Sequence, residues 1–151
     1  MKLPIDKTKK LTEELMDLLG VEAKISLSTQ GETLSVSLDS EKYKGLLIGY
    51  RGDTLNGIQT FLTLALKNKT GEWYRVVVNV GDWREKQDDY LKSLAASAVS
   101  RAKATGEGQP LYNLNAGQRR TIHMYLANEK TISTESFGEG KERYLVVKPK
   151  K

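Results

Sequence analysis

Four residues in the first half of the chain, Gly49, Tyr50, Arg51 and Gly52, have types and spacing that suit a nucleic-acid backbone. Two glycines separated by two residues let a main chain approach sugar and phosphate closely, where a Cβ atom would collide. Arg51 adds a positive charge to this GxxG turn, and the apolar Ile48 precedes it. The turn therefore predicts RNA binding.

A second group of candidate residues, Arg119, Arg120 and His123, lies in the second half. Residues four apart share one face of a helix, so Arg119 and His123 should project together, with Arg120 about a hundred degrees round from Arg119. The forked donors of a guanidinium suit phosphate oxygens. The structural alternative for His123 is a partly buried helix histidine that orients a neighbour or packs on the sheet, and the alternative for the arginines is solvated surface charge.

Other chemistries fit the sequence poorly. A P-loop needs GxxxxGK followed by Ser or Thr, and a dinucleotide site needs GxGxxG after a strand, whereas Gly52 here precedes the anionic Asp53. With no cysteine and one histidine, no metal is expected. His123 as a general base would need an acid or a metal partner, and its helix places only arginines beside it. We therefore expect neither an enzyme nor a cofactor.

Composition bounds the class of protein. The chain has 151 residues, of which 38% are apolar and 28% charged, enough for one compact domain or two small ones. It shows no apolar run of membrane-spanning length and no secretory leader, so we expect a cytoplasmic location without membrane insertion. The net charge of +5 suits a polyanionic partner. Residues 1–80 hold eleven basic and ten acidic residues, and residues 81–151 hold thirteen and nine, so the surplus lies in the second half.

Hydrophobic periodicity predicts the elements that position the first turn. A helix over 8–19 ends at Gly20, and alternating residues then predict a hairpin around Gly31. A short helix over 43–48 leads into the turn. A buried helix follows, with Leu55, Ile58, Phe61, Leu62, Ala65 and Leu66 on its core face. A valine-rich strand over 73–80 follows that helix, and Trp73 is expected to pack in the core at its start.

The second half predicts a long helix over about 84–104 with a face of small residues. A break at Gly106, Gly108 and Pro110 precedes Asn115, which can cap a helix running to about residue 128. A hairpin over 131–147 completes this half, and Lys130 and Arg143 could extend a common basic surface with Arg120.

The order of elements over residues 8–81, with its GxxG turn, resembles the KH domain of the type common in bacteria (type II). In such domains about four single-stranded nucleotides lie between the GxxG loop and an apolar groove. This resemblance implies that Gly49 and Gly52 give close approach, that Tyr50 and Arg51 contact the backbone, and that Ile48 is a groove candidate. Residues 84–149, with the tract that holds Arg119 and His123, resemble the R-three-H domain, which binds single-stranded nucleic acid. That family usually has an acidic residue just before the arginine pair, where this chain has Gln118.

A KH domain followed by an R-three-H domain is similar to the Jag family, also called SpoIIIJ-associated or KhpB proteins. The expected fold is α+β, with a KH domain over 1–81 and an R-three-H domain over 82–151, each with helices packed on a small sheet. Typical members also carry an N-terminal Jag-N domain, which these residues do not contain, so nothing that depends on it is implied.

The family resemblance implies a bacterial protein that binds single-stranded RNA, or else single-stranded DNA, and acts as a post-transcriptional regulator connected with cell elongation or division. A small KH partner similar to KhpA is implied, and a homo-oligomer is a further possibility. The alternative is a protein–protein adaptor with little direct RNA binding, because some KH folds pair through their sheets.

Overall fold

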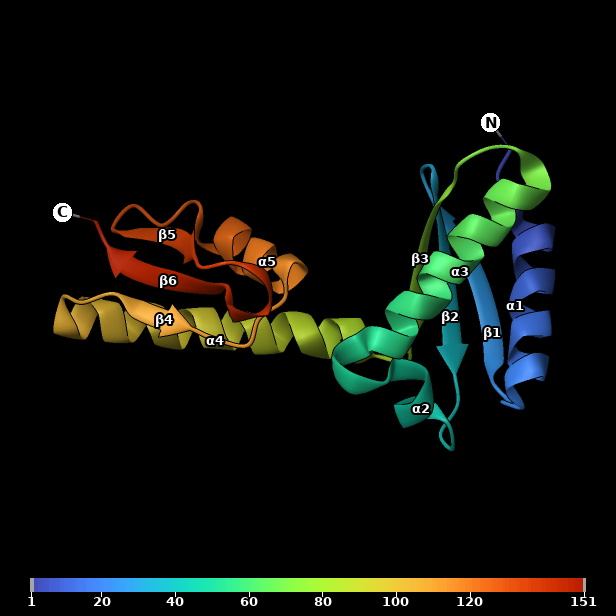
Figure 1. Cartoon of the computed structure of the whole chain (residues 1–151), viewed down its shortest axis with the longest axis horizontal. Coiled ribbons are helices and arrows are strands. Elements are labelled where there is room, and N and C mark those ends of the chain that lie inside the picture. The colour runs from blue at the N-terminus through green and yellow to red at the C-terminus, as the bar shows by residue number, and fades with distance from the viewer. Residues whose placement is uncertain (1, 151) are drawn as a thin grey trace. The chain divides into compact units, whose positions relative to one another are not determined.

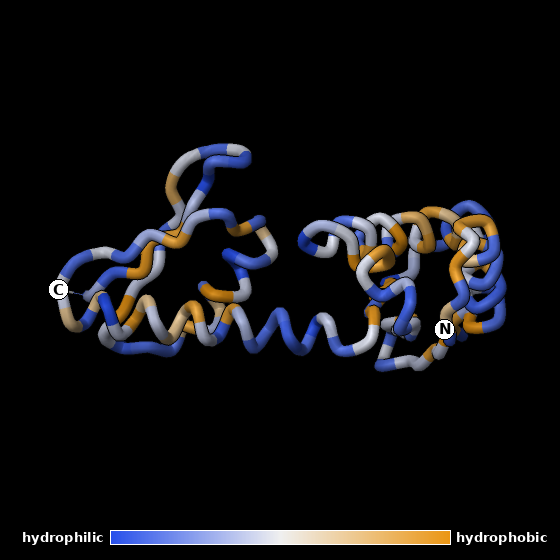
Figure 2. The backbone as a smooth tube through the Cα atoms, turned by 90° about the horizontal axis from the view of Figure 1, so that it is seen from below, coloured by the Kyte–Doolittle hydropathy of each residue, from blue (hydrophilic) through white to orange (hydrophobic). Residues whose placement is uncertain are grey.

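The computed structural model describes residues 2–150, which divide into two compact units between Arg84 and Glu85. Each unit holds one three-stranded sheet and its own apolar core. Hydrophobic and hydrophilic residues are interleaved along the helices and strands (Figure 2), as expected when each element buries one face. Within the described residues no helix is long and apolar enough to cross a membrane.

Unit 1 has the order of elements that the sequence predicts (Figure 1). Its elements are α1 (Ile5–Leu19), β1 (Lys24–Gln30), β2 (Thr33–Asp39), α2 (Lys44–Ile48), a 3₁₀ turn (Tyr50–Gly52), α3 (Asp53–Thr70) and β3 (Arg75–Val80). The sheet order is β1-β2-β3, with β2 antiparallel to β1 and parallel to β3. The α+β fold of this half is therefore confirmed.

One face of this sheet carries the core. Leu34, Val36 and Leu38 alternate along β2 and are almost completely buried, as are Val78 and Val80 on β3. The intervening Ser35 and Ser37 of β2 face the other side, as the two-residue period of a strand requires. The helices α1 and α3 contact each other, and they pack against β1 and β3 respectively. The predicted hairpin forms with Gly31 in its turn at φ 59°.

Two predicted core positions in unit 1 are wrong. Phe61 is 44% exposed, because the buried stripe of α3 runs through Leu55, Ile58, Leu62 and Leu66 and leaves the position before Leu62 about 100° away. Trp73 is 63% exposed, since β3 begins only at Arg75 and its ring lies instead beside Lys67, whose Nζ is 5.5 Å from the ring centroid.

The exposure of Trp73 carries a testable consequence. Trp73→Ala is expected to lower the free energy of unfolding by about 1 kcal/mol or less, since it removes one exposed cation–π contact. Leu62→Ala, at a fully buried position of the same unit, is the control and should cost about 2–5 kcal/mol. Urea unfolding followed by circular dichroism measures both, and a cost for Trp73→Ala as large as that of Leu62→Ala would contradict the exposed placement.

Unit 2 is built on an antiparallel sheet of order β4-β6-β5. Its elements are α4 (Trp83–Thr105, whose first two residues belong to unit 1), β4 (Gln109–Leu111), α5 (Ala116–Leu126), β5 (Ile132–Phe137), a 3₁₀ turn (Gly140–Glu142) and β6 (Tyr144–Pro149). The small residues Ala95, Ala98 and Ala102 of α4 are fully buried in its core. Strand β4, which has three residues and contains Pro110, is not predicted from the sequence.

Candidate nucleic-acid interface

The GxxG turn is a sharp reversal between two helices of unit 1. The helix α2 ends at Ile48 and is capped by Gly49, which has φ 71° and ψ −173°, and α3 begins at Asp53. Gly52 has φ 81° and Arg51 has φ 53°, so three of the four residues have a positive φ. This conformation is open to glycine and costly for most other residues.

Both glycines are also required by internal packing. A Cβ atom on Gly49 would lie 2.8 Å from the backbone nitrogen of Thr54. A Cβ atom on Gly52 would lie 2.5 Å and 2.9 Å from two ring carbons of Trp83, which packs on the core of unit 1. The sequence predicts that these glycines allow the close approach of a ligand. The structure adds a second reason for glycine at both positions, which is that a side chain would collide with Thr54 or Trp83 of the same chain.

The turn presents an aromatic ring and a cation outward. Tyr50 is 73% exposed, and the guanidinium carbon of Arg51 lies 5.1 Å from the centroid of its ring. Ile48 is half-buried and packs on the core, at the inner side of the turn. Leu46, for which the sequence predicts no role, is 60% exposed. Its neighbour Leu47 takes the core position of this one-turn helix, so Leu46 faces outward.

The first residues of α4, Trp83 and Arg84, are held against the rest of unit 1 beside the GxxG turn. Arg84 donates from Nε to the carbonyl of Val78 (2.8 Å) and from Nη2 to Oε1 of Gln59 (2.9 Å). The same Gln59 oxygen accepts from the backbone N–H of Val78 (3.0 Å). Trp83 is thereby anchored directly before Arg84, where its ring covers Gly52.

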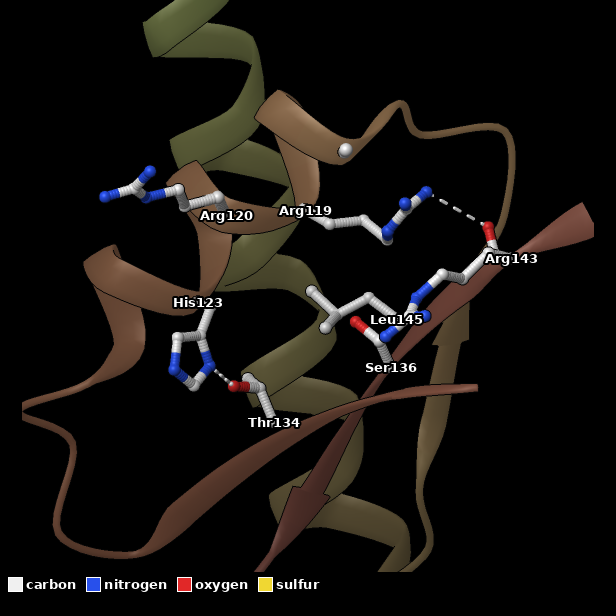
Figure 3. A pocket seen from close by; sticks show the side chains of 8 residues that line it. Arg119, Arg120, His123, Thr134, Ser136, Arg143 and Leu145 are labelled. Atoms are coloured by element: carbon white, nitrogen blue, oxygen red, sulfur yellow. Dashed lines mark hydrogen bonds between the residues drawn. The ribbon is translucent and has the colours of Figure 1, made fainter. Parts of the chain in front are cut away.

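The second candidate group lines an open pocket of about 540 Å³ in unit 2 (Figure 3). The polar lining consists of Arg119, Arg120, His123, Thr134, Ser136 and Arg143, and Ala116 and Leu145 complete it. The helix α5 supplies Arg119, Arg120 and His123, while Thr134 and Ser136 come from β5. Lys130, which was expected to share this surface, is not among the lining residues.

Arg119 lines the pocket and also links two chain segments beside it by hydrogen bonds. The side chain is half-buried, and its Nη1 donates to the carbonyl oxygens of Leu114 (2.5 Å) and Arg143 (3.3 Å). These carbonyls belong to the loop before α5 and to the residue before β6. Arg119 therefore positions Arg143 as well as supplying charge of its own.

His123 and Arg120 differ in direction on α5. In Figure 3, the His123 ring is directed toward Thr134 and Arg120 extends away from Arg119. The Nδ1 atom of His123 is hydrogen-bonded to Oγ1 of Thr134, with the donor set by the imidazole tautomer. His123 is exposed, in contrast to the partly buried position of the structural alternative, but its hydrogen bond to Thr134 gives the contact with the sheet that this alternative expects.

The start of α5 explains the glutamine that departs from the R-three-H pattern. Asn115 caps the helix, its Oδ1 accepting from the backbone N–H of Gln118 (2.8 Å), and the Gln118 side chain accepts in return from the N–H of Asn115 (2.9 Å). This capping box needs a glutamine or glutamate at that position. The predicted cap at Asn115 is confirmed, and a neutral residue fulfils the capping role.

The electrostatic character of the pocket is cationic. Three guanidinium groups and one imidazole line it, and no carboxylate stands among the described residues of its lining. Within residues 2–150 no group of three or more histidine, aspartate or glutamate side chains is arranged to hold a metal ion. The arrangement therefore suits the binding of an anion with several oxygen acceptors, such as a phosphate group.

Comparison with protein families places both units. Residues 6–78 match the KH domain of KhpA and KhpB, and residues 89–149 match the R-three-H domain. The chain belongs to the Jag (KhpB) family. Unit 1 is thus its KH unit and unit 2 its R-three-H unit, and the fold class predicted from the sequence is confirmed.

Named relatives span nearly the whole chain. The RNA-binding protein KhpB of Clostridium symbiosum is 30% identical over 149 residues, which cover 97% of this chain and 66% of that protein. The RNA-binding protein KhpB of Bacillus subtilis is 29% identical, with 98% and 72% covered. The corresponding protein of Lactiplantibacillus plantarum is 33% identical over 129 residues, which are only 40% of its length. The chain therefore spans less than two thirds of some of the proteins it resembles.

Proposed function

We propose that this chain binds single-stranded RNA through two surfaces, the GxxG turn of the KH unit and the cationic pocket of the R-three-H unit. The observation that carries the proposal is the pocket, which three arginines and a histidine line and whose described lining holds no carboxylate. The names of the relatives, all RNA-binding proteins, support the choice of nucleic acid among possible anions. Single-stranded DNA is the competing ligand of the same chemistry.

Each surface contributes a different kind of contact. At the turn, the left-handed backbone of Arg51 and Gly52 leaves the exposed Tyr50 and Arg51 side chains outside the core, where they meet sugar and phosphate. The half-buried Ile48 forms the floor on which a base edge can rest. In the pocket, Arg119 and Arg120 donate to phosphate oxygens, and His123, oriented by Thr134, adds a further donor. Two sites on one chain raise the affinity for one strand if both are engaged.

A second candidate, an adaptor that recruits a protein partner, is favoured by apolar side chains on the KH unit. Phe61 is 44% and Leu64 is 53% exposed, and both lie on α3. A small KH protein similar to KhpA is the partner that family membership suggests. From family membership we also propose a wider role, which is the regulation, in the cytoplasm, of transcripts linked to cell elongation or division.

Fluorescence anisotropy with labelled single-stranded RNA and DNA at two salt concentrations tests the proposal. We expect the affinity for RNA to fall as the salt concentration rises. A plot of the logarithm of the association constant against the logarithm of the salt concentration should have a slope of about −0.7 for each phosphate contacted. Arg120→Glu combined with His123→Ala should weaken binding roughly tenfold, because charge-assisted hydrogen bonds to phosphate are lost. This pair spares Arg119, whose removal would also release Leu114 and Arg143.

Lys92→Glu is the matched control, since it makes the same change in net charge at an exposed position of α4 outside the pocket. Equal losses in the two variants would show that affinity follows net charge and that the pocket is not the site. If the wild-type chain binds neither nucleic acid above a level that salt abolishes, the RNA proposal fails and the adaptor takes its place.

A further inference from the structure

Three aromatic residues of the R-three-H unit form a cluster on its surface. The ring centroids of Tyr112 and Tyr144 are 5.0 Å apart, and those of Phe137 and Tyr144 are 6.0 Å apart. Tyr112 is 60% exposed, Phe137 is 40% exposed and Tyr144 is half-buried. Among the described residues, the core of this unit contains aliphatic side chains and no aromatic ring, so the large rings are held outside it.

The strand register places this cluster relative to the pocket. Phe137 pairs with Tyr144 across β5 and β6, and the next pair along is Ser136 with Leu145, both of which line the pocket. Consecutive residues of a strand point to opposite faces of a sheet. At this end of the sheet, one face therefore lines the pocket and the opposite face carries the aromatic cluster. Arg143, which lines the pocket, directly precedes Tyr144.

We propose that Tyr112, Phe137 and Tyr144 form a stacking platform for bases of single-stranded RNA, an inference that rests on the proposed function of the pocket. Every base has a flat π face, so aromatic side chains bind bases of any sequence beside a groove that holds the phosphates. Here a pocket residue directly precedes a platform ring twice: Ser136 before Phe137 within β5, and Arg143 before Tyr144, the first residue of β6. A strand whose phosphate lies in the pocket can thus pass over the sheet end and stack its neighbouring bases.

The size of the cluster argues for bases over a protein partner. An aromatic side chain buries about 150–250 Å² when fully covered, so three rings with these exposures offer roughly 300 Å². A stable protein interface needs about 800 Å² from each partner. Two of the rings also carry a hydroxyl group, which suits a surface that alternates between water and a ligand.

The test compares Tyr112→Leu combined with Phe137→Leu against the wild-type chain, using labelled oligouridine and the same oligonucleotide with abasic sites. Leucine keeps the side chains apolar and removes the flat rings, while Tyr144 remains to pack between them. We expect the double variant to bind oligouridine roughly tenfold to a hundredfold more weakly, the range for loss of stacked bases. The abasic oligonucleotide should bind the wild type and the double variant equally.

The matched control is Tyr90→Leu, which removes an exposed tyrosine of α4 and should leave the affinity unchanged. Photo-crosslinking with 5-iodouridine should yield adducts at Tyr112, Phe137 or Tyr144. The platform is overturned if the double variant binds oligouridine like the wild type while Arg120→Glu with His123→Ala does not. It is also overturned if the double variant changes only the oligomeric mass measured by light scattering. No RNA binding by the wild type would defeat the platform and the proposed function together.

Discussion

Replacing Gly52 by alanine is expected to destabilise the KH unit by about 2–4 kcal/mol. A residue with a side chain at φ 81° has a cost of roughly 1–2 kcal/mol in the left-handed region. The added Cβ atom would also lie 2.5 Å from a ring carbon of Trp83, so the ring must shift and lose part of its packing against the core. Both effects act on the same position and should add.

Tryptophan fluorescence in a urea titration measures this loss specifically, because both tryptophans of the chain, Trp73 and Trp83, belong to the KH unit. The matched control is Gly57→Ala in α3, where a Cβ atom would meet nothing within 4 Å. That change should stabilise the unit by about 0.5–1 kcal/mol, since alanine favours the helix over glycine. A Gly52→Ala variant that unfolds at the wild-type urea concentration would contradict the packing of Trp83 on the turn.

Replacing Tyr50 and Arg51 together by aspartate is expected to lower the affinity for single-stranded RNA about 100-fold. The change removes a cation and an aromatic ring and places two anions where the proposal puts the phosphates. The turn itself should persist, because both side chains are exposed and aspartate tolerates the left-handed conformation that Arg51 adopts at φ 53°. The free energy of unfolding should therefore change by about 0.5 kcal/mol or less.

Anisotropy titrations measure the affinity, and circular dichroism checks that the variant is folded. Lys10→Glu with Thr29→Asp is the control, since it makes the same change in net charge at exposed positions on α1 and β1. Equal losses in the two variants would show that the turn is not the contact. Little RNA affinity in the wild type, together with a loop variant that still binds a KH partner, would instead favour the adaptor, with Phe61 and Leu64 as the surface to mutate next.

Much of the fold was predictable because its elements carry strong local patterns. The leucine spacing before Gly20 predicted α1, although that helix begins three residues earlier than expected, at Ile5. The alternation on both sides of Gly31 predicted the hairpin. Asn115 has the residue type of a helix cap and proved to be one. A short strand such as β4 cannot be predicted from hydrophobic periodicity, because three residues that include a proline show almost no periodic pattern.

The sequence by itself determined the order of elements in the KH unit, the position of the glycine turn and the residues of α5 that could face a phosphate, because these depend on the spacing of near neighbours along the chain. Only the tertiary structure decided which distant groups meet those residues. Gly52 meets Trp83, Arg119 reaches the carbonyl of Arg143, and His123 meets Thr134. Trp73 and Phe61 were misplaced for the same reason: whether an apolar side chain is covered depends on where the rest of the chain packs, which local periodicity does not contain.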